Sequence, residues 1–158
     1  MIIIADAGPL LHLHCVEALT WALPDQPIEV VEEVWTEVEK FAPDALRDSR
    51  LHRCVIGQLP ARELSRWRLD PGERMALSYA LAQRKSSVVL VLCDEREARL
   101  ACRDLSIPIT GSIGLIVEAS RAGRVARKIA EDALRALPNR GRLYVEQYLI
   151  DITVAGLL

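Results

Sequence analysis

The sequence predicts an α/β domain in which a mainly parallel central sheet is flanked by helices. Strand-like and helix-like patterns alternate along most of the 158 residues, as βαβ units require. The segment 87–92 is apolar on both faces, which is typical of a central strand in a parallel sheet. The length fits one domain, and the chain contains neither an internal repeat nor a low-complexity linker. We therefore expect a single domain over residues 1–158.

The first elements follow from apolar runs and turn residues. Residues 2–5 form an apolar run that predicts a short buried strand, and Pro9 is well placed in the first turn of the helix that follows. The apolar side chains of that helix recur at helical spacing at Leu10, Leu11, Leu13, Val16 and Leu19. A second strand is expected at 28–31 and a helix over 31–40.

The later elements have clearer boundaries after a weakly periodic stretch at 41–69, where we expect one or two short helices and a strand at 53–56. Asp70 and Pro71 are a typical helix N-cap and first helical residue. The remaining predicted elements are, in order, a strand at 87–92, a helix at 96–105, a strand at 108–109 and helices at 113–122, 126–136 and 142–150.

The net charge of −2 gives no general reason to expect affinity for nucleic acid or for a membrane. The charge is nevertheless uneven, because residues 1–48 carry ten acids and two bases, whereas residues 96–142 carry ten bases and five acids. This gradient indicates either an acidic half facing a basic half or ordinary helix surfaces that differ in charge. No apolar run approaches the roughly 20 residues that cross a bilayer. The first residues lack the basic region of a secretory signal.

The cysteines predict reduced structural thiols in a cytoplasmic protein. They form no C-x-x-C pair, and the histidines complete no zinc spacing. A nucleophilic pair of Cys15 with His12 or His14 is a less favoured alternative. The cysteines are Cys15, Cys54, Cys93 and Cys102.

Acidic residues mark the expected functional site. Asp6 follows the first predicted strand and Asp94 follows the strongest, and ligands of open α/β sheets bind at the carboxyl ends of strands. Glu37 and Glu73, on the second and third main helices, are further candidates. Converging carboxylates would repel each other by roughly 1–4 kcal/mol per close pair. A hard divalent cation such as Mg²⁺ or Mn²⁺ relieves that repulsion.

Four segments resemble the successive motifs of the PIN-domain nucleases, and most closely those of a prokaryotic PIN-like subgroup related to VapC-type toxins. A fifth segment, 108–115 followed by 119–123, is also similar to that subgroup. The likeness covers residues 1–125, with C-terminal helices over 126–158. It implies a three-layer α/β/α PIN-like fold with a mainly parallel central sheet. The four segments are Ile2–Leu11, Val34–Val38, Leu69–Leu77 and Leu92–Arg99.

The resemblance implies a metal-dependent endoribonuclease, with RNA as substrate, that acts as the toxin of a toxin–antitoxin pair. It assigns catalysis and the binding of Mg²⁺ or Mn²⁺ to Asp6, Glu37, Glu73 and Asp94. Leu92 departs from the pattern, because many PIN nucleases have a hydroxyl residue there, and Glu95 or Glu97 could supply a further carboxylate. The resemblance also implies a small antitoxin partner and a homodimer, and the apolar surplus of the C-terminal helices fits either.

Substrate contacts are expected from cations close to the acids. Arg96 and Arg99 follow Asp94 and suit phosphate oxygens, although pairing with neighbouring acids is an equal alternative. Thr110 and Ser112 stand at the start of a predicted helix, where they could cradle a phosphate or simply cap the helix.

The sequence argues against three other enzyme or signalling classes. A haloacid-dehalogenase phosphatase needs Asp-x-Asp, but the first acid here is followed by Ala7 and Gly8. No G-x-G-x-x-G follows the first strand, which excludes a dinucleotide fold. A response-regulator receiver domain needs an acid pair and a lysine late in the chain, and the lysines at 40, 85 and 128 fit that pattern poorly. The serious alternative is a PIN-like RNA- or protein-binding module with weak or no catalysis.

Overall fold

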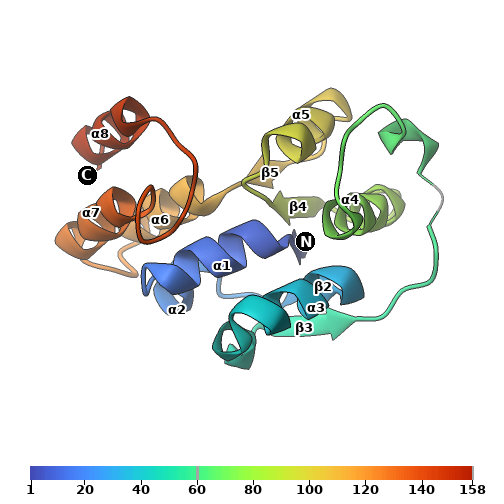
Figure 1. The fold of residues 1–158 in the computed structure, drawn as a ribbon, viewed down its shortest axis with the longest axis horizontal. Helices are drawn as coiled ribbons and strands as arrows, with labels where there is room; N and C mark the ends of the chain where they lie inside the picture. Colours follow the sequence, from blue (N-terminus) through green and yellow to red (C-terminus); the bar gives the residue numbers. More distant parts are fainter. Residues whose placement is uncertain (60, 158) are drawn as a thin grey trace.

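The computed structural model describes residues 1–59 and 61–157, and at its centre lies a five-stranded parallel sheet in the order β3-β2-β1-β4-β5 (Figure 1). All four neighbouring strand pairs are parallel, which confirms the predicted sheet. The strands are β1 Ile2–Ala5, β2 Ile28–Val31, β3 Leu51–Cys54, β4 Val89–Leu92 and β5 Ile109–Thr110.

Helices flank this sheet, so that the fold is the expected three-layer α/β/α arrangement (Figure 1). Helix α4 packs against β1, β2 and β4, whereas α1 packs against α3 and α6. The α-helices are α1 Ala7–Cys15, α2 Leu19–Ala22, α3 Glu32–Phe41, α4 Pro71–Gln83, α5 Arg96–Asp104, α6 Ser112–Arg121, α7 Arg127–Ala136 and α8 Gln147–Ala155. Two short 3₁₀ segments, η1 Pro43–Arg47 and η2 Arg62–Leu64, complete the described elements. No helix in the described residues combines the length and the apolar character that crossing a membrane requires.

The strand order reverses at β1, and this reversal positions the site. From β1 the chain builds outward through β2 to β3, and then returns to the other side of β1 to add β4 and β5. Ligands of open α/β sheets bind where the order reverses, at the carboxyl ends of the strands. The N–H of Asp6 donates to the carbonyl of Leu92 at 2.9 Å, so the ends of β1 and β4 stay side by side.

The apolar runs form the core because both sides of the central strands are covered. Ile3 and Ile4 on β1 and Leu92 on β4 are fully buried, as the absence of a polar face in these segments predicts. Each fully buried aliphatic side chain of this size contributes roughly 1.5–3 kcal/mol to the stability of the fold. The sheet therefore provides a rigid base for the residues that follow its strands.

Two predicted boundaries were wrong, each for a packing reason. Strand β3 lies at 51–54 rather than 53–56, because Leu51 pairs with Ile28 and faces the core, whereas Val55 is exposed. Helix α8 begins at Gln147 rather than at 142, because Arg142 adopts a positive φ of 55° that a helix does not allow.

Candidate functional site

Asp6 is a buried carboxylate at the carboxyl end of β1. Only 3% of the residue is exposed to solvent. Burial raises its pKa from the ordinary 3.8 to about 6, and the nearby charges of Asp70 and Glu37 raise the pKa further. Burying an acid in this way destabilises the fold unless something compensates the charge, so the position indicates a functional requirement.

Four other acids surround Asp6 and complete what we call the acidic cluster. Burial first, and then the charges of Asp70, Asp6 and Glu95, raise the pKa of Glu73 from 4.5 to about 7. Burial and the charges of Asp70 and Glu95 likewise raise the pKa of Glu37. The cluster therefore consists of Asp6, Glu37, Asp70, Glu73 and Glu95.

A capping box at the start of α4 orients two members of the cluster. The Asp70 carboxylate accepts a hydrogen bond from the Glu73 N–H at 2.7 Å, and the Glu73 carboxylate accepts one from the Asp70 N–H at 3.0 Å. The intervening Gly72 lets α4 approach α3 closely, since a Cβ there would lie 3.2 Å from Val34 Cγ2, and Glu37 Oε2 is also close, at 3.6 Å. This packing brings Glu37 beside the capping box.

No protein cation neutralises the acidic cluster within residues 1–59 and 61–157. None of the ion pairs formed there includes a member of the cluster. A set of carboxylate oxygens without a protein counter-charge suits a hard divalent cation such as Mg²⁺ or Mn²⁺. As the side chains stand, no three acids, histidines or cysteines of the described chain converge closely enough to enclose an ion. Binding would therefore require the carboxylates to rotate inward.

Asp94 makes a different set of contacts from the other predicted acids. Its Oδ2 lies 2.7 Å from His12 Nδ1 and accepts a hydrogen bond from Ser112 Oγ at 2.6 Å, while its Oδ1 accepts one from the Ser112 N–H at 2.7 Å. These contacts hold α1 and the start of α6 to the end of β4. The structure thus brings Asp6, Glu37 and Glu73 together, but it directs Asp94 toward His12 and Ser112.

Sequence reasoning did not single out Asp70 as a charged neighbour of the site, and it gave Glu95 only a supporting place. Asp70 was interpreted as a helix cap, which it is, and the cap geometry alone could have indicated that its charge lies next to Glu73. Glu95 is exposed, and its charge raises the pKa values of Glu37 and Glu73. The preceding residue, Asp94, is not among the charges that raise these pKa values. Consecutive residues at a strand end point in opposite directions, so the sequence alone does not tell whether Asp94 or Glu95 faces the cluster.

Cys93 lies beside Asp6, one position after Leu92, the residue that departs from the motif pattern by lacking a hydroxyl. Its Sγ lies 3.5 Å from Asp6 Oδ2, and burial followed by the Asp6 charge raises the pKa of this thiol. A neutral thiol is a weak donor to the carboxylate. Leu92 is fully buried in the core. The side chain nearest Asp6 at the end of β4 is therefore a thiol rather than a hydroxyl.

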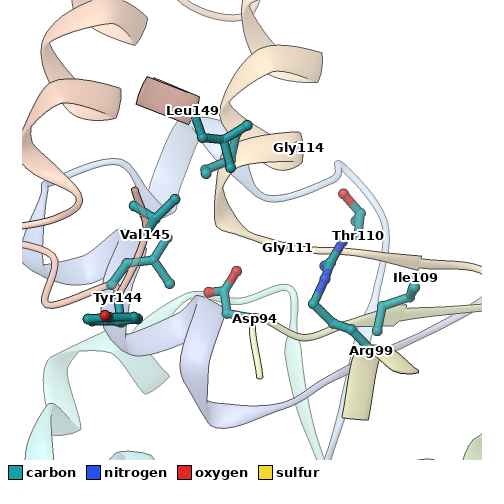
Figure 2. A pocket seen from close by; sticks show the side chains of 11 residues that line it. Asp94, Arg99, Ile109, Thr110, Gly111, Gly114, Tyr144, Val145 and Leu149 are labelled. Carbon is teal, nitrogen blue, oxygen red and sulfur yellow. The ribbon is translucent and has the colours of Figure 1, made fainter. Parts of the chain in front are cut away.

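The predicted substrate residues divide into two groups. Both polar groups of Ser112 bind Asp94, so the start of α6 is capped by this carboxylate and not by Thr110 or Ser112. Arg99 and Thr110 line a cavity of about 320 Å³ next to Asp94 (Figure 2). Arg96 is exposed at the start of α5. Neither arginine pairs with an acid in the described residues, and Arg99 instead donates to the Cys93 carbonyl at 3.0 Å.

The raised pKa values predict a pH-dependent stability. Asp6 and Glu73 bind protons more tightly in the folded chain than in the unfolded chain, so ionising them favours unfolding. The free-energy penalty for ionising the two groups in the folded chain is absent below about pH 4 and complete above about pH 7. In EDTA, we expect Asp6→Asn to be more stable than the natural chain at pH 7.5 by about 1–3 kcal/mol, a difference that shrinks toward pH 4.5. Urea denaturation at both pH values measures it, and an equal difference at both would contradict the prediction.

Comparison with known proteins identifies one family. The family model described as DUF3368, a PIN domain, matches residues 2–154. No curated protein and no solved structure matches the chain at a significant level. The match spans every strand and helix that forms the acidic cluster and the neighbouring cavity.

Proposed function

This chain belongs to the PIN-domain family, whose members are generally nucleases, and from that premise we propose that it is a metal-dependent endoribonuclease. The observation that carries the proposal is the acidic cluster at the reversal of strand order, which no protein cation neutralises in the described residues. PIN domains typically use divalent metal ions, and the donors of the cluster are the oxygen ligands that Mg²⁺ and Mn²⁺ prefer.

Asp6, Glu37, Glu73 and Glu95 are the side chains that would hold the ion. Asp94 was included in the metal site by its motif, but we now assign it to positioning, because both of its oxygens are engaged by His12 and Ser112. When bound, a divalent ion supplies an acidified water and neutralises charge on the phosphodiester.

The residues of the chain prepare this site in three ways. The buried sheet end excludes bulk water from Asp6, which strengthens its interaction with any cation. Glu73, with a pKa raised to about 7, can hold or release a proton near neutral pH. Arg96 and Arg99, which follow the cluster on α5, would attract and orient the phosphates that the carboxylates alone repel.

We further propose that the protein is the toxin of a toxin–antitoxin pair and forms a homodimer, as the resemblance of its motifs to those of VapC-type toxins implies. Exposed apolar side chains on α8, including Tyr148, Leu149 and Ile152, support a surface for a second chain. Equilibrium sedimentation at two concentrations tests the dimer. Growth arrest on induced expression, relieved by a small protein from a neighbouring reading frame, tests the toxin role.

The second candidate function is a PIN-like module that binds RNA or protein without cleaving it. It is favoured by one observation: no three potential ligands of the described residues converge on a common point, since Glu73 is held in its capping box.

RNA cleavage with controlled metal distinguishes the two candidates. We expect the purified protein to cleave an end-labelled single-stranded RNA in Mn²⁺ and to lose this activity in EDTA, because without the ion no water is activated and the charge on the phosphodiester is not neutralised. Activity restored by adding excess Mn²⁺ to the chelated sample is the control. RNA binding without cleavage in every sample would favour the binding module. Cleavage that persists in EDTA would refute the metal dependence.

A further inference from the structure

A pocket of about 320 Å³ opens beside Asp94 and has an exposed aromatic ring on its rim (Figure 2). Its walls come from α5, β5, the start of α6 and the loop that precedes α8. We call it the Tyr144 pocket. Asp94, Arg99, Thr110, Tyr144, Val145 and Leu149 line it, with further contributions from neighbouring apolar residues.

Tyr144 is available for stacking. The residue is 98% exposed, so its ring contributes little to the core. The chain has few aromatic residues, which makes an aromatic side chain in an exposed loop noteworthy. A second hollow, of about 450 Å³ and lined by residues 138, 139 and 142–145, also borders Tyr144. The ring therefore stands between two hollows. An exposed, flat ring of this kind is what proteins use to stack unpaired bases.

Arg99 supplies positive charge on the opposite side of the pocket, with Asp94 between the two residues in this view (Figure 2). Its Nη1 donates to the Cys93 carbonyl, and no other hydrogen bond of its guanidinium is present in the described residues. The planar group thus keeps donors for a phosphate. The Asp94 carboxylate is the opposing charge, but His12 and Ser112 already engage both of its oxygens.

We propose that the Tyr144 pocket binds one unpaired nucleotide of an RNA strand, with its base stacked on Tyr144 and its phosphate on Arg99. The inference rests on the proposed nuclease function and identifies a site at which the strand binds. Asp94 lines the pocket, and Glu95 of the acidic cluster follows it directly in the chain.

Binding of a short, fluorescently labelled single-stranded RNA in EDTA tests the pocket without cleavage. At about 50 mM salt we expect Tyr144→Ala to weaken binding by about tenfold, while Tyr144→Phe, which keeps the ring, stays within about twofold. Phe41→Ala is the matched control, because the Phe41 ring is also exposed but lies outside both the pocket and the α8 surface. Arg99→Gln should weaken binding and lower the salt dependence by roughly one counterion, whereas Arg103→Gln should not.

The possible failures are distinguishable. Equal effects of Tyr144→Ala and Phe41→Ala, or no RNA binding by the natural chain, would overturn the nucleotide pocket. A change in sedimentation in place of RNA affinity would also overturn it, and would mark the ring as a contact between proteins. RNA binding that depends on Tyr144, without cleavage in Mn²⁺, would support the pocket and refute the nuclease. Cleavage in Mn²⁺ without dependence on Tyr144 would support the nuclease and refute the pocket.

Discussion

Replacing Asp6 with asparagine is expected to reduce RNA cleavage by at least ~100-fold, while the protein remains folded. The two side chains have nearly the same shape, but asparagine removes the buried negative charge at the centre of the acidic cluster. Initial cleavage rates in Mn²⁺ measure the effect, and circular dichroism checks the fold. Glu39→Gln is the matched control, because Glu39 is an exposed acid on α3 outside the cluster.

A measurement of metal affinity separates the residues that hold the ion from those that position them. Titration of Mn²⁺ followed by electron paramagnetic resonance should show affinity reduced by about tenfold or more in Asp6→Asn and Glu95→Gln. Asp94→Asn should keep its affinity within about threefold, although the loss of its charged contacts with His12 and Ser112 destabilises the fold. If Asp94→Asn weakened Mn²⁺ binding as much as Asp6→Asn does, Asp94 would be a ligand, as its motif implied.

Replacing Gly111 with alanine is expected to lower the free energy of unfolding by about 2–4 kcal/mol. The backbone at Gly111 is extended, with φ −124° and ψ −171°, so alanine meets no conformational barrier. The added Cβ would instead lie 3.1 Å from the Cys93 carbonyl oxygen and closer still to Asp94 Oδ1. The Asp94 carboxylate would have to leave the N–H of Ser112, and the start of α6 would lose its cap.

Urea denaturation at neutral pH measures this loss. Gly57→Ala is the matched control, because a Cβ at Gly57 meets no atom within 4 Å and should change stability by less than about 0.5 kcal/mol. Equal stabilities of the two variants would show that the region around Asp94 relaxes freely. In that case, the assignment of Asp94 to a rigid positioning role would be wrong.

The order of strands and helices could be predicted because each element carries its own local signal. Residues 2–5 and 89–92 are continuous apolar runs, and the cap at Asp70 with Pro71 predicts the start of α4 to the residue. Boundaries set by tertiary packing could not be predicted. The register of β3 depends on a contact between Leu51 and a strand that lies earlier in the chain.

The candidate site was predictable to the extent that strand ends identify it. Asp6 follows a strand, and Glu37 and Glu73 lie on helices that pack at the same edge, so their meeting follows from the α/β topology. The choice between Asp94 and Glu95 depends on the direction in which the chain leaves β4, which local sequence does not encode. The contact between His12 and Asp94 joins residues that are far apart in the chain, and no periodicity signals it.

The central place of β1 has a consequence for synthesis on the ribosome. Ile2 pairs with Val89, so more than half of the chain must be synthesised before β4 can pair with β1, the first strand to be made. Until then, an apolar strand edge stays open to other nascent chains or to a chaperone. We expect translation that stalls before residue 89 to yield aggregation-prone fragments, because only β4 covers the open side of β1.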